Sequence, residues 1–144
     1  MTETPATPRI FYYFLKNYNK ISYIMDSILK PEGLTAGQYT ALSFLKRFEP
    51  CTSAELARHQ NITAQSMGEY LSALENKGFV EREYLDGNRR NIMVRRSPAG
   101  IEVQARCDAI VHQAEQAYLS PIPPEDVDRL VRQLTQLFHS QENQ

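Results

Sequence analysis

The stretch SAELARHQNITAQSMGEYLSALENKGFV, residues 53–80, decides the fold. Its apolar residues recur at three- and four-residue steps, which predicts a short helix over residues 53–59 and a second over residues 63–77. Ser53 can cap the first helix, and Gly78 stands where a left-handed residue ends the second. Two short helices joined by a brief turn are typical of a helix-turn-helix, whose second helix can lie in the major groove of DNA.

After this stretch the period changes from that of a helix to that of a strand. Residues 79–85 and 91–97 read as two short strands, and the pair Asp86-Gly87 between them is a strong signal for a tight turn. The sequence therefore predicts a two-stranded wing directly after the helix-turn-helix, with Arg89 and Arg90 at its tip.

Helices are also predicted on both sides of this unit. Residues 9–29 carry an apolar stripe at helical period, and residues 35–48 follow with a capping box at their start. Beyond the wing, a long helix runs from Pro98 to about residue 119, and a last helix covers residues 125–139 after three prolines. The first and last helices have more apolar surface than one small core can cover, so an identical chain is expected to cover the rest.

Length and composition agree with a soluble globular domain and exclude a membrane-spanning protein. The chain has 144 residues, of which 42% are hydrophobic and 23% charged, as in soluble globular proteins. No apolar run is long enough to span a bilayer, and acid and proline precede the first apolar stretch, so we expect a cytoplasmic protein without a signal peptide. The net charge is −1, but residues 76–97 hold six basic against three acidic side chains, and such local charge attracts an anionic partner.

Catalytic and metal-binding motifs are not evident. The two cysteines form no CxxC pair and no histidine stands at ligand spacing, so neither a metal site nor a disulfide scaffold is expected. The sequence also offers no nucleophile–base pair and no phosphate-binding loop. We therefore predict a protein that is not an enzyme and uses no cofactor.

Together these residues resemble the MarR family of winged-helix transcription regulators. The resemblance covers about residues 10–138 and is carried by LTAGQYTALSFL at residues 34–45, by residues 53–82 and by the wing NRRNIMV at residues 88–94. It implies a homodimer held by its terminal helices on a pseudo-palindromic operator, with an effector pocket where lobe and dimer helices meet. Where the family usually has Leu-Thr at the start of the long helix, this chain has Arg96-Ser97.

The expected fold is thus mainly α with a small β wing, in a single domain of residues 1–144. A winged helix-turn-helix lobe of about residues 34–97 stands between dimerisation helices at about residues 9–30 and 98–139. The expected function is that of a sequence-specific regulator of double-stranded DNA, a repressor that a small ligand releases. The alternatives are an oxidation-sensing regulator of the same fold and a winged-helix module that binds proteins.

Candidate DNA-binding residues lie on the second helix and at the wing tip. Gln65 can pair with adenine, Ser66 can donate to a base or a phosphate, and Glu69 can accept from cytosine. A tight turn presents Arg89 and Arg90 to the minor groove, and Arg90 occupies the arginine position of the family's wing. A solvated face and an ordinary turn are the alternative interpretations. The candidates are Thr63, Gln65, Ser66, Glu69, Arg89 and Arg90.

Two further candidate sites concern the effector and oxidation. The chain has eight tyrosines, and Tyr12, Tyr39 and Ser43 are candidates for a pocket that takes a small aromatic or phenolic effector; packing is the alternative role for these tyrosines. Tyr39 occupies a pocket-lining position in similar proteins. Cys51 lies near a helix start, which lowers a thiol pKa, but no cation adjoins it in the sequence. A buried and inert thiol is therefore the expected state of Cys51, and redox sensing is the alternative.

Overall fold

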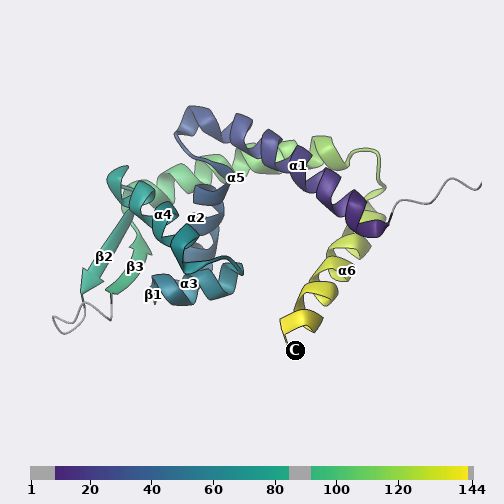
Figure 1. The fold of residues 1–144 in the computed structure, drawn as a ribbon. Helices are drawn as coiled ribbons and strands as arrows, with labels where there is room; N and C mark the ends of the chain where they lie inside the picture. The colour runs from purple at the N-terminus through teal and green to yellow at the C-terminus, as the bar shows by residue number, and fades with distance from the viewer. Residues whose placement is uncertain (1–8, 85–91, 143–144) are drawn as a thin grey trace, which may run out of the picture. The chain divides into compact units, whose positions relative to one another are not determined.

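The structure is a computed structural model that describes residues 9–84 and 92–142 (Figure 1). It is mainly helical with one small sheet, which confirms the predicted fold class. The elements follow one another as α1 (Ile10–Leu29), η1 (Lys30–Glu32), α2 (Ala36–Phe48), β1 (Cys51–Thr52), α3 (Ser53–Gln60), α4 (Ala64–Asn76), β2 (Val80–Tyr84), β3 (Ile92–Arg96), α5 (Pro98–Leu119) and α6 (Pro124–Glu142).

Side-chain caps determine where α2, α3 and α4 begin. At α2 the predicted capping box is present: Thr35 Oγ1 accepts from the Gln38 amide at 3.2 Å, and Gln38 Oε1 accepts from the Thr35 amide at 3.3 Å. The predicted cap of α3 is wrong by one residue, because Thr52 and not Ser53 accepts from the amide of the third helical residue. The caps fix the helix-turn-helix locally, and Asn61 ends α3 in the left-handed conformation with φ 58°.

The core of the lobe is built from the apolar faces of the helix-turn-helix and its neighbours. α4 buries Met67, Leu71 and Leu74 completely against α2 and α3, in agreement with the predicted apolar face. Burying each such side chain stabilises the fold by about 1.5–3 kcal/mol before entropy is subtracted. The fully buried large side chains of α1, α2, α3 and β3 that join this core are Leu29, Leu42, Leu45, Leu56 and Val94.

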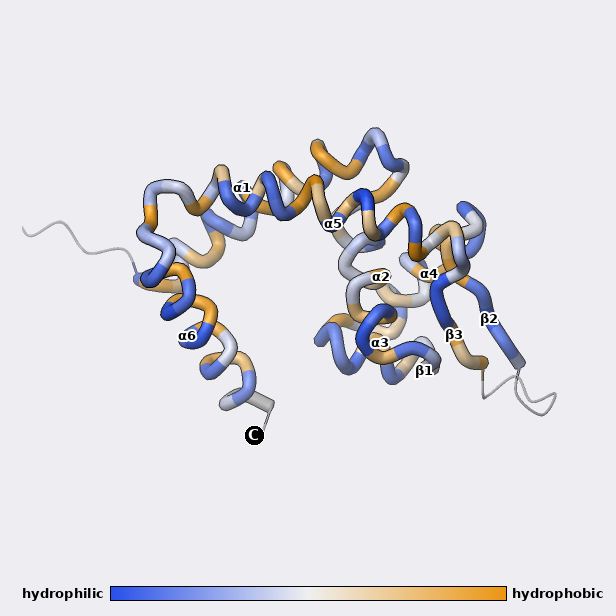
Figure 2. The backbone as a smooth tube through the Cα atoms, turned by 180° about the vertical axis from the view of Figure 1, so that it is seen from behind, coloured by the Kyte–Doolittle hydropathy of each residue, from blue (hydrophilic) through white to orange (hydrophobic). Residues whose placement is uncertain are grey.

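The sheet has three antiparallel strands in the order β1-β3-β2. The two wing strands were predicted; β1 was not, and it pairs Cys51 with Val94 of β3. On the other side of β3, Arg82 is opposite Val94 and Val80 is opposite Arg96. Only Val80 of β2 is buried, and Figure 2 shows this strand as hydrophilic. The wing therefore presents a polar surface while its base is anchored in the core.

α5 begins at a cap that also fastens it to the end of α4. Ser97 Oγ donates to the Gly78 carbonyl at 2.6 Å and accepts from the Gly100 amide at 3.0 Å, which confirms the predicted helix start at Ser97-Pro98. Contacts divide the chain into Met1–Ile110 and Val111–Gln144, so α5 belongs to both units. α6 is amphipathic, with hydrophobic and hydrophilic residues alternating along it in Figure 2. Within the part of the chain that the structure describes, no helix could cross a membrane.

Candidate nucleic-acid interface

The N-cap and the first two turns of α4 hold the predicted helix residues, of which Thr63, Gln65 and Glu69 are exposed and Ser66 is half-buried. Thr63 Oγ1 accepts from the Ser66 amide and donates to Ser66 Oγ, both at 3.0 Å, so the hydroxyl of Ser66 keeps its own proton to donate. Gln65 and Glu69 are exposed, on the side of α4 opposite the buried apolar face. This face offers donors and acceptors of the kind that pair with base edges.

Contacts on the side of α4 away from its exposed residues hold this helix against α2 and η1. The Tyr70 ring packs so closely on Gly37 of α2 that a Cβ there would lie 2.3 Å from the ring. Lys77 Nζ donates to the Gly33 carbonyl at 2.5 Å and to Gln38 Oε1 at 2.8 Å. These contacts fix the direction in which α4 presents its exposed residues.

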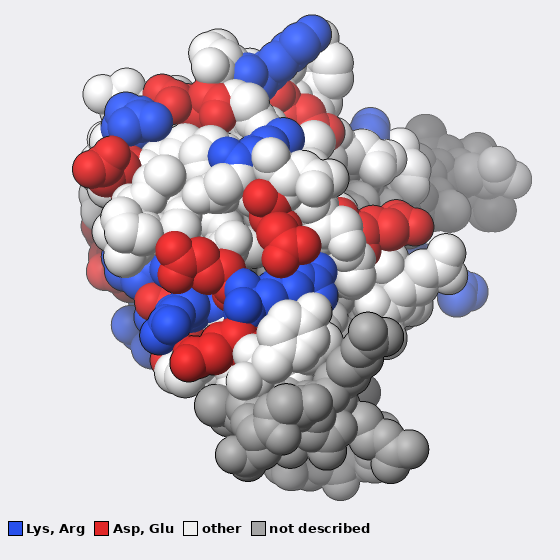
Figure 3. Space-filling view, turned by 90° about the vertical axis from the view of Figure 1, so that its left-hand side faces the viewer, with Lys and Arg blue, Asp and Glu red and all other residues white. Residues whose placement is uncertain are grey.

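The described base of the wing carries charges that neutralise one another. Arg95 lies 3.8 Å from Glu81 and 3.1 Å from Glu83, while Arg82 of β2 lies 3.3 Å from Glu75 of α4. Figure 3 shows acidic and basic side chains interleaved on one face of the molecule. Arg89 and Arg90 lie outside the described residues, so their role at the wing tip stays a prediction.

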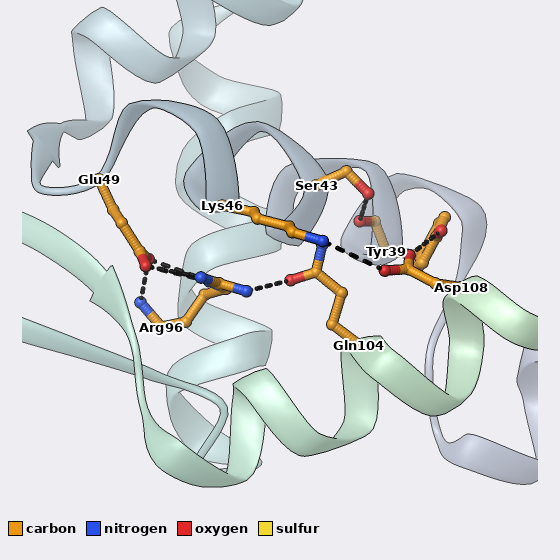
Figure 4. A network of polar contacts seen from close by, with 7 residues as sticks. All are labelled: Tyr39, Ser43, Lys46, Glu49, Arg96, Gln104 and Asp108. Atoms are coloured by element: carbon orange, nitrogen blue, oxygen red, sulfur yellow. Dashed lines mark hydrogen bonds and ion pairs between the residues drawn. The ribbon is translucent and has the colours of Figure 1, made fainter.

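A polar network ties the base of the wing to α2 and α5 (Figure 4). Arg96, the last residue of β3, donates through its backbone amide to Glu49 Oε2 at 2.9 Å and through Nη2 to Glu49 Oε1 at 2.8 Å. Its Nη1 donates to Oε1 of the buried Gln104 at 2.9 Å. Burial alone would raise the pKa of Glu49, but the hydrogen bonds from Arg96 outweigh it, and the pKa is lowered from 4.5.

Sequence reasoning missed this network. Its one signal was Arg96 itself, which stands where the resembled family usually has leucine. Glu49 and Gln104 gave no signal, because only the fold brings the end of α2 beside the first turns of α5.

Of the three candidate effector residues, the fold brings Tyr39 and Ser43 together but not Tyr12. Tyr39 donates from its hydroxyl to Asp108 Oδ1 at 2.5 Å, and Lys46 lies 3.8 Å from the other oxygen of Asp108. Ser43, one turn along α2, donates to the Tyr39 carbonyl at 3.1 Å. Burial and then the Asp108 carboxylate raise the pKa of Tyr39, so this phenol stays protonated.

Tyr12 lies apart from these two residues. It is in the first turn of α1, where it packs edge-to-face on Tyr13 and lies under Lys16. α1 meets the start of α2 near Asp26, whose carboxylate accepts from the Ala36 amide at 2.7 Å. Tyr12 is 14 residues earlier, or about 20 Å along the helix, so one chain does not place it beside Tyr39.

Cys51 has the properties of an unreactive thiol. It is buried in β1, and burial followed by the charges of Glu55 and Glu49 raises its pKa to about 11. The helix start therefore does not lower this pKa, because burial of the thiol dominates and the Glu55 and Glu49 charges add to it. Cys107 is likewise buried, with a pKa raised to about 11. Among residues 9–84 and 92–142 no cluster of three metal-ligating side chains occurs.

The helix-turn-helix and the sheet beside it define a winged-helix protein, and comparison with known proteins shows which winged-helix proteins it is similar to. The MarR family model matches residues 32–90, a stretch that includes the whole helix-turn-helix. The HTH-type transcriptional repressor Rv2887 of Mycobacterium tuberculosis is 29% identical over 113 residues, which cover 78% of this chain and 81% of that repressor.

Two solved structures show the same fold. MepR of S. aureus, in a complex with DNA, is 20% identical, with a TM-score of 0.81 over 93% of this chain and 99% of its own. A Staphylococcus aureus MarR, in complex with salicylate and kanamycin, is 18% identical, with a TM-score of 0.82 over 94% of this chain and 91% of its own.

Proposed function

We propose that the protein is a homodimeric repressor that binds a pseudo-palindromic operator in double-stranded DNA, in the cytoplasm, and that a small phenolic ligand releases it. The observation that carries this proposal is the face of α4. Gln65 and Glu69 are exposed on its first two turns with the half-buried Ser66 beside them, while the opposite face is completely buried and fixes its direction. In a helix-turn-helix it is this part of the second helix that enters the major groove.

The terminal helices support the dimer. α1 leaves large apolar side chains open, among them Phe11 at 73% exposure and Leu15 at 63%. On α6, Val131 and Leu137 are also exposed. Apolar surface of this extent is rare on monomers and is commonly covered by a second copy of the chain. Two copies also place two α4 helices for two half-sites.

The effector proposal rests on Tyr39 and Asp108. A ligand with a phenolic hydroxyl can replace the Tyr39 hydroxyl as the donor to Asp108, whereas a carboxylate ligand meets the charge of Asp108. We therefore propose a neutral phenol as the effector, with Ser43 on the same side of α2 and Tyr12 supplied from elsewhere in the dimer. Binding of simple phenols and of the matching benzoates, measured by release of labelled DNA, tests this choice.

The central experiment is a selection of duplexes from a random-sequence pool with the wild-type protein. Repressor function predicts an enriched sequence with two related half-sites whose centres lie about one helical turn apart. Affinity for that sequence should fall steeply with salt, because lysine and arginine contacts release counterions from phosphates. Recovery of a pool without an enriched sequence would contradict the proposal and favour a module that binds proteins.

A further inference from the structure

Gly68 has no explanation in the fold. It lies in the interior of α4, in ordinary helical conformation, and a Cβ added to it would meet no atom within 4 Å. Glycine is less favourable than any residue except proline inside a helix, so the lobe would fold better with alanine at this position.

The other described glycines differ from Gly68 in this respect. Gly33 and Gly78 have φ values of 77° and 80°, which strongly favour glycine. At Gly37 and Gly100 a Cβ would lie 2.3 Å from an aromatic ring and 2.0 Å from a backbone carbonyl oxygen. At each of these four positions the fold itself requires glycine, through the backbone conformation or through lack of space for a Cβ. Since the fold does not require glycine at position 68, a binding partner is the reason that remains.

The position of Gly68 on α4 indicates which partner requires glycine there. Helical periodicity places it on the same side as Gln65 three residues earlier and Ser72 four residues later, next to Glu69. These neighbours are exposed, and the face opposite them is completely buried. The half-buried backbone of α4 therefore carries no side chain at one point, in the middle of the candidate DNA-reading face.

We propose that Gly68 is the point of closest approach between α4 and the DNA, where the helix backbone lies against the duplex without an intervening side chain. This inference rests on the proposed function and adds a specificity-determining residue to it. A side chain here would hold the helix out of the groove and lengthen the hydrogen bonds that Gln65 makes to base edges. Contacts with bases suffer more from such a shift than the longer-range attraction to phosphates does.

The test compares Gly68→Ala with wild-type protein on the selected duplex and on random DNA. We expect the substitution to raise the melting temperature by about 2–5 °C, because alanine favours the helix. We expect it to weaken binding of the selected duplex at least tenfold and of random DNA less than threefold. Gly68→Ser should weaken selected-duplex binding at least as much, since its side chain is larger.

Ser27→Ala is the matched control. It also replaces an exposed helical residue with alanine, but it lies on α1 and outside the candidate DNA-reading face, so its affinity should stay within twofold of the wild type. Undiminished binding by Gly68→Ala, an equal loss in Ser27→Ala or a lower melting temperature for Gly68→Ala overturns the inference while the proposed function stands. Failure of the wild-type protein to enrich any duplex overturns the proposed function, and the inference with it.

Discussion

The guanidinium group of Arg96 binds both carboxylate oxygens of Glu49, with Nη2 2.8 Å from Oε1 and Nε 3.1 Å from Oε2. Glu49 is the residue that ends α2, and Arg96 is the last residue of β3. The pair therefore fastens the base of the wing to the helix that supports α4. Gln104 extends the connection to α5 by accepting from the same guanidinium group.

Replacing Arg96 with methionine should lower the free energy of unfolding by about 2–3 kcal/mol, because Glu49 and Gln104 lose the guanidinium donors in a mostly buried position and Glu49 keeps only the backbone amide. A denaturant titration measures this loss. In a double-mutant cycle with Glu49→Gln, the coupling should be about 1–3 kcal/mol. Arg95→Met is the matched control: its two ion pairs are half-exposed, so it should cost less than about 1 kcal/mol. A coupling near zero would show that the Arg96 pair contributes no more than the exposed one.

The same pair should make stability depend on pH in one direction. The pKa of Glu49 is lower in the folded chain than its usual 4.5. A group with a lowered folded pKa stabilises the fold above its unfolded pKa, and this contribution is lost as pH falls through the folded pKa. The stability difference between wild type and Glu49→Gln should therefore be constant above about pH 5.5 and shrink below about pH 4. A difference that grows on acidification would contradict this origin.

The exposed apolar stripe of α1 should be required for dimer formation. At low micromolar concentration the wild-type protein should sediment at twice the chain mass. A glutamate in place of Leu15, on the apolar stripe, should shift it to the monomer, because a charge would be buried without a partner. Lys20→Glu introduces the same side chain on the polar side of α1, four residues after Lys16, and should leave the dimer intact. A well-folded wild-type monomer at this concentration would contradict the architecture.

The order of the helices and the two wing strands could be predicted from the sequence because each carries a local signal. Apolar residues at helical spacing face one core, and Thr35 and Ser97-Pro98 mark boundaries by chemistry that acts within a few residues. β1 could not be predicted, because two residues show no alternation and their pairing partners lie far along the chain in β3.

In the candidate site, too, placements within one helix could be predicted and contacts between distant elements could not. The residues of α4 share one face because they share one helix, so their placement follows from helical period alone. The pairing of Arg96 with Glu49 and that of Tyr39 with Asp108 each join elements that are distant in sequence. Cys51 could not be judged either, since its pKa depends on burial and on two carboxylates that only the folded chain brings near.

Arg90 should contribute to DNA binding through charge. Replacing it with alanine should weaken binding to all duplexes and lower the slope of log affinity against log salt by about one for each wing, or about two for the dimer. Fluorescence anisotropy over a salt series measures both quantities. Arg95→Ala is the comparison, because Arg95 already faces Glu81 and Glu83 and should leave the slope unchanged. Equal slopes for wild type and Arg90→Ala would mean that the wing tip touches no phosphate.

Gln65 should read a base edge. It is exposed on the first turn of α4, beside the bonded pair Thr63 and Ser66 that orders this turn. Gln65→Ala should cost about 1–3 kcal/mol on the selected duplex, because an amide makes two hydrogen bonds to adenine, and much less on random DNA. The deciding quantity is the ratio of the two affinities, measured in one titration series.

Two other outcomes for Gln65 have distinct meanings. Equal losses on both duplexes would show that Gln65 binds the DNA backbone, since phosphate contacts carry no sequence information. Unchanged binding with a small shift in melting temperature would show that it serves only the start of the helix. Ser72→Ala, one turn beyond Gly68 on the same exposed face, serves as the control: if it lowers the ratio as much as Gln65→Ala does, the readout is spread along α4 rather than concentrated in its first turn.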